Sequence, residues 1–423
     1  MWIGAILVGL SAVLYARLTA VMQIWYSRWY VSHYYSLALL SPIAFLAATA
    51  LVKKFAPEAK GSGIPQVLEA IHLKKSSSPK SGQRIDQLTS IYTSAIKILS
   101  SALGILGGAS IGREGPTVQI ASSGFAWVGK RAQKWFPRLD AETFLVAGAA
   151  AGVAAAFNTP IAGITFAIEE IAEGAFGAAR ESVMLAVVIS GITAQGLLGD
   201  YLYFGQPHIL HPTVFILVQA VLIGLIGGVL GGGFAKLLAF PSLTRLPKKW
   251  WLRSLACGTL CTVIGLATKG ATAGSGYEVT REALSAQSID HINPYFPIWK
   301  FITTILSYLS GMAGGIFSPS LSIGAGLGLS AARLFHFQNF GACALIGMVA
   351  FFSGVVQAPL TAVIIVMEMT NEHILIIPFM VAAFIAHAIG KQFMPIPLYR
   401  FLAMNAKALE SIKRNESALT VLK

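Results

Sequence analysis

The segment SIGREGPTVQ, residues 110–119, places Arg113 and Glu114 side by side within a strongly apolar part of the chain. If this part lies in a membrane, an ionised carboxylate there costs about 2.5–3.5 kcal/mol unless hydrogen-bond donors stabilise it. Adjacent residues on a helix do not face each other, so Arg113 is a poor donor for Glu114. The N-termini of helices are better candidates, because they carry unpaired backbone N–H groups.

Three pentapeptides in the chain share the form G-x-x-x-P and read as loops that run into a helix with proline in its first turn. They are GSGIP (61–65), GREGP (112–116) and GIFSP (315–319). Helix N-termini that point into one cavity form an anion site without a full positive charge. The candidate donors are the Ser62 hydroxyl and the backbone amides near Ile316 and Phe317. The alternative is that these turns only allow close helix packing.

Ser62 also allows an enzymatic interpretation, in which its hydroxyl is the nucleophile of an intramembrane hydrolase. Such a nucleophile needs a base that the fold places beside it. The chain contains neither H-E-x-x-H nor the G-x-S-G pattern of membrane serine proteases. We therefore do not expect an enzyme.

The composition indicates whether these motifs lie in water or in a membrane. Of 423 residues, 55% are hydrophobic and 12% are charged, and the mean hydropathy is +0.68. Soluble domains are about 25% charged, so the chain is predicted to be an all-α polytopic membrane protein. Its apolar stretches suit roughly ten or more helices of about 20 residues each. Residues 1–24 are read as the first membrane helix, because their apolar run is too long for a cleavable signal peptide.

The basic balance, 31 Lys and Arg against 18 Asp and Glu, does not indicate a nucleic-acid partner, because the basic residues cluster in short loops. These loops are HLKKSSSPKSGQR (72–84), KRAQKWFPR (130–138) and RLPKKWWLR (245–253). The positive-inside rule predicts that such loops are cytoplasmic. The three cysteines lie in apolar stretches without metal-ligand spacing and are expected to be reduced thiols. We expect no metal site and no cofactor.

The chain contains an internal repeat. GSG at 61 returns at 274, the motif of Pro116 returns at Pro319, and NTPIAGITFAIEE returns as QAPLTAVIIVMEM, at offsets of 213, 203 and 199 residues. Two repeats with broken helices are typical of transporters whose half-helices meet at a midplane site. We expect one transmembrane domain over 1–423, with repeats at about 35–200 and 213–390. The remaining segment, 391–423, then carries the last pathway residues and a short cytoplasmic tail.

Together with PLY at 397–399, the three pentapeptides resemble the four anion-pathway signatures of the CLC family of chloride channels and proton-coupled chloride antiporters. The similarity extends over about residues 50–400 and includes FNTPIAGITFAIEE (157–170). This resemblance implies a CLC-type fold of two inverted-topology repeats with tilted and broken helices. It also implies a homodimer in the cell membrane with one pathway per subunit, and chloride and protons as the transported ions.

By the same resemblance, the hydroxyls of Ser62 and Tyr399 and the amides of Ile316 and Phe317 coordinate a central chloride. Glu114 would be the gating glutamate on the external side. An ionised Glu114 can occupy an anion site as a tethered substitute for chloride. Desolvation and a nearby anion both favour the protonated carboxyl. Chloride entry therefore favours protonation of Glu114 and its departure from the site.

Exchange also requires an internal proton route. Glu170 aligns by resemblance with the internal proton-transfer glutamate of antiporter members, where channel members commonly have an apolar residue. This favours a proton-coupled antiporter over the alternative, a passive voltage- or pH-gated chloride channel with the same fold. The neighbouring Glu169, with Glu368 at its repeat-related position, is expected only to end its helix at the cytoplasmic surface.

Three weaker expectations complete the sequence analysis. Serine at position 62 goes with chloride preference among relatives. Only about two dozen residues follow Tyr399, so nucleotide-sensing cytoplasmic domains are not expected. In GLIGGVLGGG (224–233) small residues recur four apart, which suits close helix contact either in a dimer interface or within one subunit.

Overall fold

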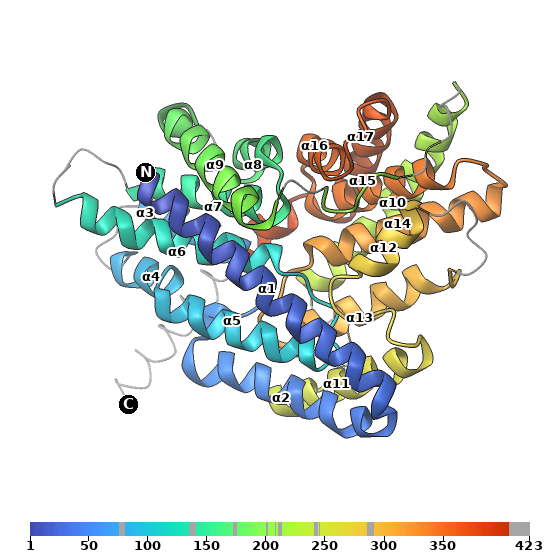
Figure 1. The fold of residues 1–423 in the computed structure, drawn as a ribbon, viewed down its shortest axis with the longest axis horizontal. Coiled ribbons are helices and arrows are strands. Elements are labelled where there is room, and N and C mark those ends of the chain that lie inside the picture. Colours follow the sequence, from blue (N-terminus) through green and yellow to red (C-terminus); the bar gives the residue numbers. More distant parts are fainter. Residues whose placement is uncertain are drawn as a thin grey trace.

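The computed structural model describes residues 1–75, 81–134, 141–171, 176–199, 202–207, 209, 214–240, 244, 246–285 and 292–405. Over these residues the protein is almost entirely helical (Figure 1). The first half forms α1 Trp2–Ser32, η1 Tyr34–Ser36, α2 Leu37–Phe55, η2 Pro57–Ala59, α3 Ile64–Lys75, α4 Ser81–Leu88, α5 Ile91–Leu106, α6 Glu114–Ala132, α7 Ala141–Phe157, α8 Pro160–Phe166, the π-helix η3 Ala167–Ile171 and α9 Phe176–Leu198. The second half forms α10 Ile216–Ala239, α11 Trp250–Ala267, α12 Tyr277–Ser285, α13 Phe296–Ser310, α14 Phe317–Phe335, α15 Phe340–Val356, α16 Pro359–Thr370 and α17 Ile376–Phe393, and a last helix begins at residue 398.

The described helices are apolar, as the composition predicts, but many are shorter than the expected 20 residues. Seven are long and apolar enough to cross a membrane, and α7, α15 and α16 are shorter apolar helices. From Phe144 to the end of α7, and from Gly341 to the end of α15, every residue is buried. A helix that is apolar on all sides belongs in the interior of the protein. These two helices therefore form the centre around which the others pack.

The two halves repeat the same series of helices. Both α6 and α14 have 19 residues, and both α7 and α15 have 17. The long helix α1 packs on α7 and α9, as the long helix α10 packs on α15 and α17. This correspondence favours a first repeat that begins with α1, whereas the range expected from the sequence, about 35–200, leaves α1 out.

Glu169 and Glu368 join the two halves by a reciprocal contact between α8 and α16. The Glu169 carboxylate accepts the backbone N–H groups of Leu360 and Thr361 at 3.0 and 2.7 Å, at the start of α16. The Glu368 carboxylate accepts those of Ile161 and Ala162 at 3.0 and 2.7 Å, at the start of α8. Each glutamate lies near the C-terminal end of its own helical segment and contacts the N-terminus of the other helix. The two helices, α8 and α16, therefore run antiparallel.

The expectation that Glu169 only ends a helix at the cytoplasmic surface is therefore wrong. Its side chain is partly buried and caps the N-terminus of α16, with a further hydrogen bond from the Thr361 hydroxyl at 2.7 Å. Unpaired N–H groups at a helix start need such acceptors, and a carboxylate there also complements the helix dipole. The sequence interval of 199 residues between the two glutamates reflects this reciprocal capping.

The glycines spaced four apart in GLIGGVLGGG contact other helices of the same subunit, which favours packing within one subunit, one of the two alternatives left open by the sequence. Gly224 and Gly228 face Ala382 and Ala386 of α17, and Gly231 faces the backbone of Phe351 in α15. All three cysteines, Cys257, Cys261 and Cys343, are buried free thiols, as expected.

Two glycines of α10 provide a test of this packing. A Cβ on Gly231 would lie 2.6 Å from the Phe351 carbonyl oxygen, whereas a Cβ on Gly233 would have no atom within 4 Å. Overpacking a tight contact costs about 1–3 kcal/mol, so Gly231→Ala is expected to lower the thermal unfolding midpoint in detergent. Gly233→Ala is the matched control and should leave it unchanged or slightly raised. Equal midpoints for the two variants would contradict this packing.

Candidate functional site

The three glycine-rich loops and their following helices meet at the middle of the molecule. The Gly112 and Gly315 backbones exchange two hydrogen bonds, each 2.8 Å long. The Gly61 N–H donates to the Met312 carbonyl at 2.9 Å, and the Gly61 carbonyl accepts the Gly314 N–H at 3.1 Å. The loops before α3, α6 and α14 are thus joined directly. Irregular backbone at membrane depth is tolerated only when protein or a water-filled cavity satisfies its polar groups.

Buried lysines support one of these loops, at Gly61, and the repeat-related GSG loop at 274. The Lys97 ammonium, on α5, donates to the Gly61 carbonyl at 2.9 Å. Lys300, on α13, donates to the carbonyls of Thr272 and Gly274, each at 2.8 Å. Both side chains are fully buried. Lys300 follows Lys97 by the same 203 residues that separate Pro319 from Pro116, so each repeat fixes its GSG loop with a lysine.

Glu114 is the first residue of α6 and is 1% exposed. Its Oε1 accepts a hydrogen bond from the Tyr203 hydroxyl at 3.2 Å, and the Arg113 guanidinium lies 5.7 Å from the centre of the Tyr203 ring. The other carboxylate oxygen lies where a side chain on Gly112 would be, so a larger residue at position 112 would displace the Glu114 side chain. The carboxylate is thus buried at the start of a helix. The sequence did not identify Tyr203 as its partner, because that residue lies 89 positions away.

A cavity of about 580 Å³ opens beside Glu114. Arg113 and Tyr203 also line it, as does the loop that contains Gly274. Glu114 therefore has room to move on the side of the cavity as well as a hydrogen bond on the protein side.

Ser62 lies close to α6 and to Tyr399. A side chain on Gly115 would collide with the Ser62 hydroxyl, so the start of α6 touches the GSGIP loop. The Tyr399 hydroxyl neighbours Ser62 and lies within electrostatic range of both Glu114 and Glu170. Among the described residues, the hydroxyls of Ser62, Ser318 and Tyr399 are buried and have no hydrogen-bond partner of regular geometry. Buried hydroxyls of this kind are suited to bind a ligand.

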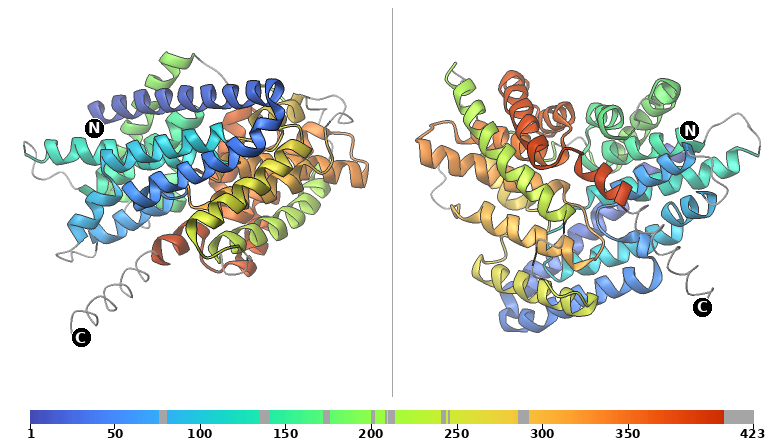
Figure 2. Two further views of the ribbon diagram at one scale, coloured as in Figure 1. Left: turned by 90° about the horizontal axis from the view of Figure 1, so that it is seen from below. Right: turned by 180° about the vertical axis from the view of Figure 1, so that it is seen from behind.

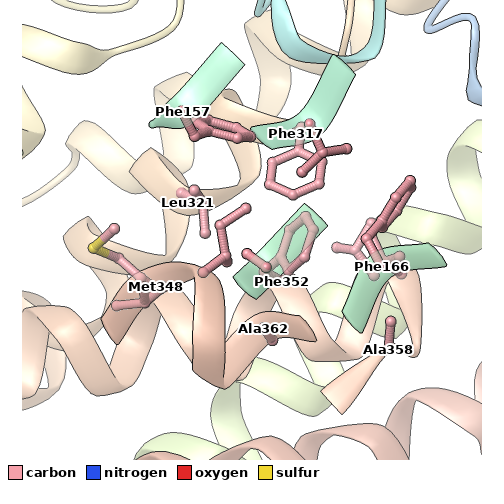
Figure 3. Close-up of a cluster of buried hydrophobic side chains, with 14 of the residues drawn as sticks. Phe157, Phe166, Phe317, Leu321, Met348, Phe352, Ala358 and Ala362 are labelled. Atoms are coloured by element: carbon pink, nitrogen blue, oxygen red, sulfur yellow. The ribbon is translucent and has the colours of Figure 1, made fainter. Parts of the chain in front are cut away.

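Ile316 and Phe317 form the start of α14, and both are 1% exposed. No side chain caps this helix start, so its first amides are free of side-chain acceptors. The Phe317 ring packs against the rings of Phe352 and Phe157, with centroids 4.1 and 5.0 Å away, in the apolar cluster of Figure 3. This packing fixes the helix start within an apolar wall. A low-dielectric surrounding strengthens the attraction of the amides for an anion.

Glu170 lies in the π-helix η3, which follows α8, and is 1% exposed. Such π-helical turns are frequent at functional sites. The Arg400 guanidinium donates to the Glu169 carbonyl at 2.9 Å, and Arg400 directly follows Tyr399. The helix that carries Tyr399 is therefore attached to the turn that carries Glu170. The segments that carry all six residues selected from the sequence therefore converge in the structure. These residues are Ser62, Glu114, Glu170, Ile316, Phe317 and Tyr399.

Tyr308 is a further hydroxyl that the sequence did not indicate. Its hydroxyl oxygen lies 3.6 Å from the position of a Cβ on Gly61, next to the GSGIP loop, and the residue also influences Tyr399 electrostatically. It lies on α13, in a part of the sequence with no motif. Among the described residues there is no group of three or more His, Cys, Asp or Glu side chains that could hold a metal ion.

Comparison with known proteins agrees with this arrangement. A family model described as "Voltage gated chloride channel" matches residues 43–391. The H(+)/Cl(-) exchange transporter ClcA of Salmonella typhimurium is 32% identical over 408 residues, which cover 90% of this chain and 83% of that protein. ClcA of Salmonella typhi gives the same values.

Solved structures show the same fold. A slow cyanobacterial Cl-/H+ antiporter matches with a TM-score of 0.81 and 26% identity, over 96% of this chain and 97% of that one. A CLC-type fluoride/proton antiporter matches with a TM-score of 0.73 and 24% identity, over 95% and 96% of the two chains. The apolar helices, the converging helix starts and these matches lead to one conclusion. The chain belongs to the CLC family and is a multi-pass integral membrane protein.

Proposed function

We propose that this protein exchanges protons for chloride across the cell membrane. The observation that carries the proposal is a pair of buried carboxylates, Glu114 and Glu170, both within electrostatic range of the Tyr399 hydroxyl. Between the segments that carry them lie buried hydroxyls without regular hydrogen-bond partners among the described residues. The names of the ClcA relatives and of the cyanobacterial antiporter support the same assignment.

Chloride binds between the start of α14 and the hydroxyls of Ser62 and Tyr399. The amides of Ile316 and Phe317 donate to it, and the helix dipole of α14 adds partial positive charge. The neighbouring Ser318 hydroxyl is a further buried donor. Hydroxyls and amides release chloride more readily than a full positive charge would, which suits a transported ion. No cofactor takes part.

Glu114 acts as the external gate and as a proton acceptor. Its carboxylate lies at the start of α6, where it takes the place of an anion. Incoming chloride and the negative carboxylate repel each other, so chloride favours the protonated form. A neutral Glu114 is no longer held by the helix start, and it can turn into the adjoining cavity. The proton and the chloride therefore move in alternation.

Glu170 transfers protons on the internal side. It is buried in η3, close enough to Tyr399 for the two side chains to interact electrostatically. The Arg400 bond to the neighbouring carbonyl holds this turn against the helix of Tyr399. A proton that leaves Glu114 can thus reach a second carboxylate near the chloride site without crossing it.

The functional unit is proposed to be a homodimer with one pathway in each subunit. The segments that carry the pathway residues converge within one subunit, and we expect each subunit to have its own pathway. The lipid bilayer surrounds the rest of the apolar surface. Mass photometry of the purified protein would measure the number of subunits directly.

A liposome experiment tests the exchange. Purified protein is reconstituted with a high internal chloride concentration, and a pH electrode records the external solution. Chloride efflux is expected to drive protons inward against their gradient, and valinomycin with potassium should change the rate of both fluxes. Chloride efflux with a flat pH trace at several starting pH values would instead indicate an uncoupled channel.

Glu114→Gln should abolish proton flux in this assay, because an amide cannot take up a proton, while chloride flux continues. Proton flux is expected to fall to the level of protein-free liposomes. Glu278→Gln is the matched control, since Glu278 lines the same outer cavity but is exposed; it should keep both fluxes. Surviving proton transport in Glu114→Gln would contradict the gating role.

Glu170→Gln should likewise remove proton flux and spare chloride flux, because the internal proton acceptor is lost while the anion donors remain. Glu181→Gln, an exposed carboxylate on α9, serves as the control. Simultaneous electrode recordings of chloride and pH make the measurement. If Glu170→Gln keeps the proton flux of the control, the internal route runs elsewhere.

A further inference from the structure

A basic site lies where the end of α2 and the start of α11 meet Lys60, the residue that precedes the GSGIP loop. These two helices pack side by side at the edge opposite α9 and α17 (Figures 1 and 2). The hydroxyl oxygens of Thr49 and Ser254 are 2.9 Å apart and join them. Thr49 lies in the last two turns of α2 and Ser254 in the second turn of α11. The end of one helix and the start of the other therefore reach the same membrane surface.

Six basic residues belong to this site. They are Lys53, Lys54, Lys60, Lys248, Lys249 and Arg253. The side chains of Lys60 and Arg253 meet beside Gly311, because the Lys60 Cε and an Arg253 guanidinium nitrogen both lie 4.0 Å from the position of a Cβ there. The segments that carry these two residues are far apart in the sequence, so only the fold brings the charges together.

The positive charges at this site are not neutralised by nearby carboxylates. Among the described residues, neither Lys60 nor Arg253 has an ion pair, and the nearby Glu58 binds Arg84 instead, at 2.8 Å. The Nε atom of Arg253 is buried and has no hydrogen-bond partner among the residues that the structure describes. Although part of Lys60 reaches solvent, desolvation lowers the pKa of its amino group, and the charges of Arg253 and Lys53 lower it further.

The start of α11 adds to this positive potential. Its N-cap residue is Lys249, no side chain caps the helix, and its first turn contains no acidic residue. Helix starts normally carry Ser, Thr, Asp or Asn at the N-cap and tolerate acidic residues in the first turn. A lysine in this place adds to the positive end of the helix dipole, and a bound anion would offset both. The backbone amides at the start of α11 and the basic side chains are thus both suited to bind an anion.

The same two helices carry exposed apolar side chains near the ends that bear the basic residues. Phe55 at the end of α2 is 55% exposed, and Trp251 and Leu252 at the start of α11 are 44% and 42% exposed. Further along α11, Leu260 and Val263 are 46% and 59% exposed. Tryptophan is enriched where a membrane protein meets the headgroup region. An apolar surface that continues from a basic site suits a molecule with an anionic head and hydrocarbon chains.

We propose that Lys60, Arg253 and the start of α11 bind the phosphate of an acidic phospholipid, whose acyl chains lie along α2 and α11. Basic pockets between transmembrane helices are suited to anionic headgroups. Free inorganic phosphate shares the headgroup chemistry but makes no use of the exposed apolar side chains. The exposed Phe55 and Trp251 therefore favour the lipid.

Native mass spectrometry of the full-length protein in detergent tests this site by titration with phosphatidylglycerol and with phosphatidylcholine. The wild type should retain phosphatidylglycerol in preference. The double variant Lys60→Gln/Arg253→Gln should bind it about tenfold more weakly, because two of the basic residues near the headgroup are lost. The control Lys236→Gln/Lys391→Gln removes two exposed lysines elsewhere, in the last turns of α10 and α17, and should bind as the wild type does.

Three results would overturn the proposal. The first is equal retention of phosphatidylglycerol by the double variant and the control. The second is equal retention of the two lipids by the wild type, which needs no variant and applies even if the double variant does not fold. The third is displacement of phosphatidylglycerol by inorganic phosphate at millimolar concentration, which would identify a site for free anions.

Discussion

The structure depends on how broken helices satisfy their backbone inside a membrane. Hydrocarbon offers no hydrogen-bond partner to an exposed N–H or carbonyl group. The protein meets this constraint by pairing its interruptions with each other, as in the two reciprocal hydrogen bonds between Gly112 and Gly315. Glycine allows the two backbones to approach closely at these points. The start of α14 remains without a side-chain cap, and this leaves donors for an anion.

The same constraint explains why charged residues occur in pairs related by the repeat. Glu169 and Glu368 each cap a helix of the opposite half, and Lys97 and Lys300 each hold a loop carbonyl. In both pairs, the partly buried glutamates and the fully buried lysines, an ionisable side chain is held by backbone groups instead of by an opposite charge. Charges used in this way stiffen the framework, since neither partner can leave without an uncompensated buried group. In the proposed exchange, the proton-carrying carboxylates are instead Glu114 and Glu170.

The arrangement separates the rigid framework of helices from the side chain that is proposed to bind the proton. The apolar wall around Phe317 and the small-residue contacts of α10 hold the helix starts in position. Glu114, in contrast, has one hydrogen bond from Tyr203 and an adjoining cavity. A side chain with one such bond can exchange it for solvent at little cost after protonation. In the proposed exchange, the movement of this one side chain couples the two ions.

The sequence by itself determined the membrane environment and the internal repeat, because composition and the spacing of glycines and prolines are encoded within short stretches. Its resemblance to the CLC family pointed to the candidate residues Ser62, Glu114, Glu170, Ile316, Phe317 and Tyr399. Only the tertiary structure decided the partners of these residues. It gave Glu169 a capping role, assigned the α10 glycines to contacts within the subunit, and placed Tyr203 and Tyr308 near the site. Such contacts join positions far apart in the chain, so no local pattern records them.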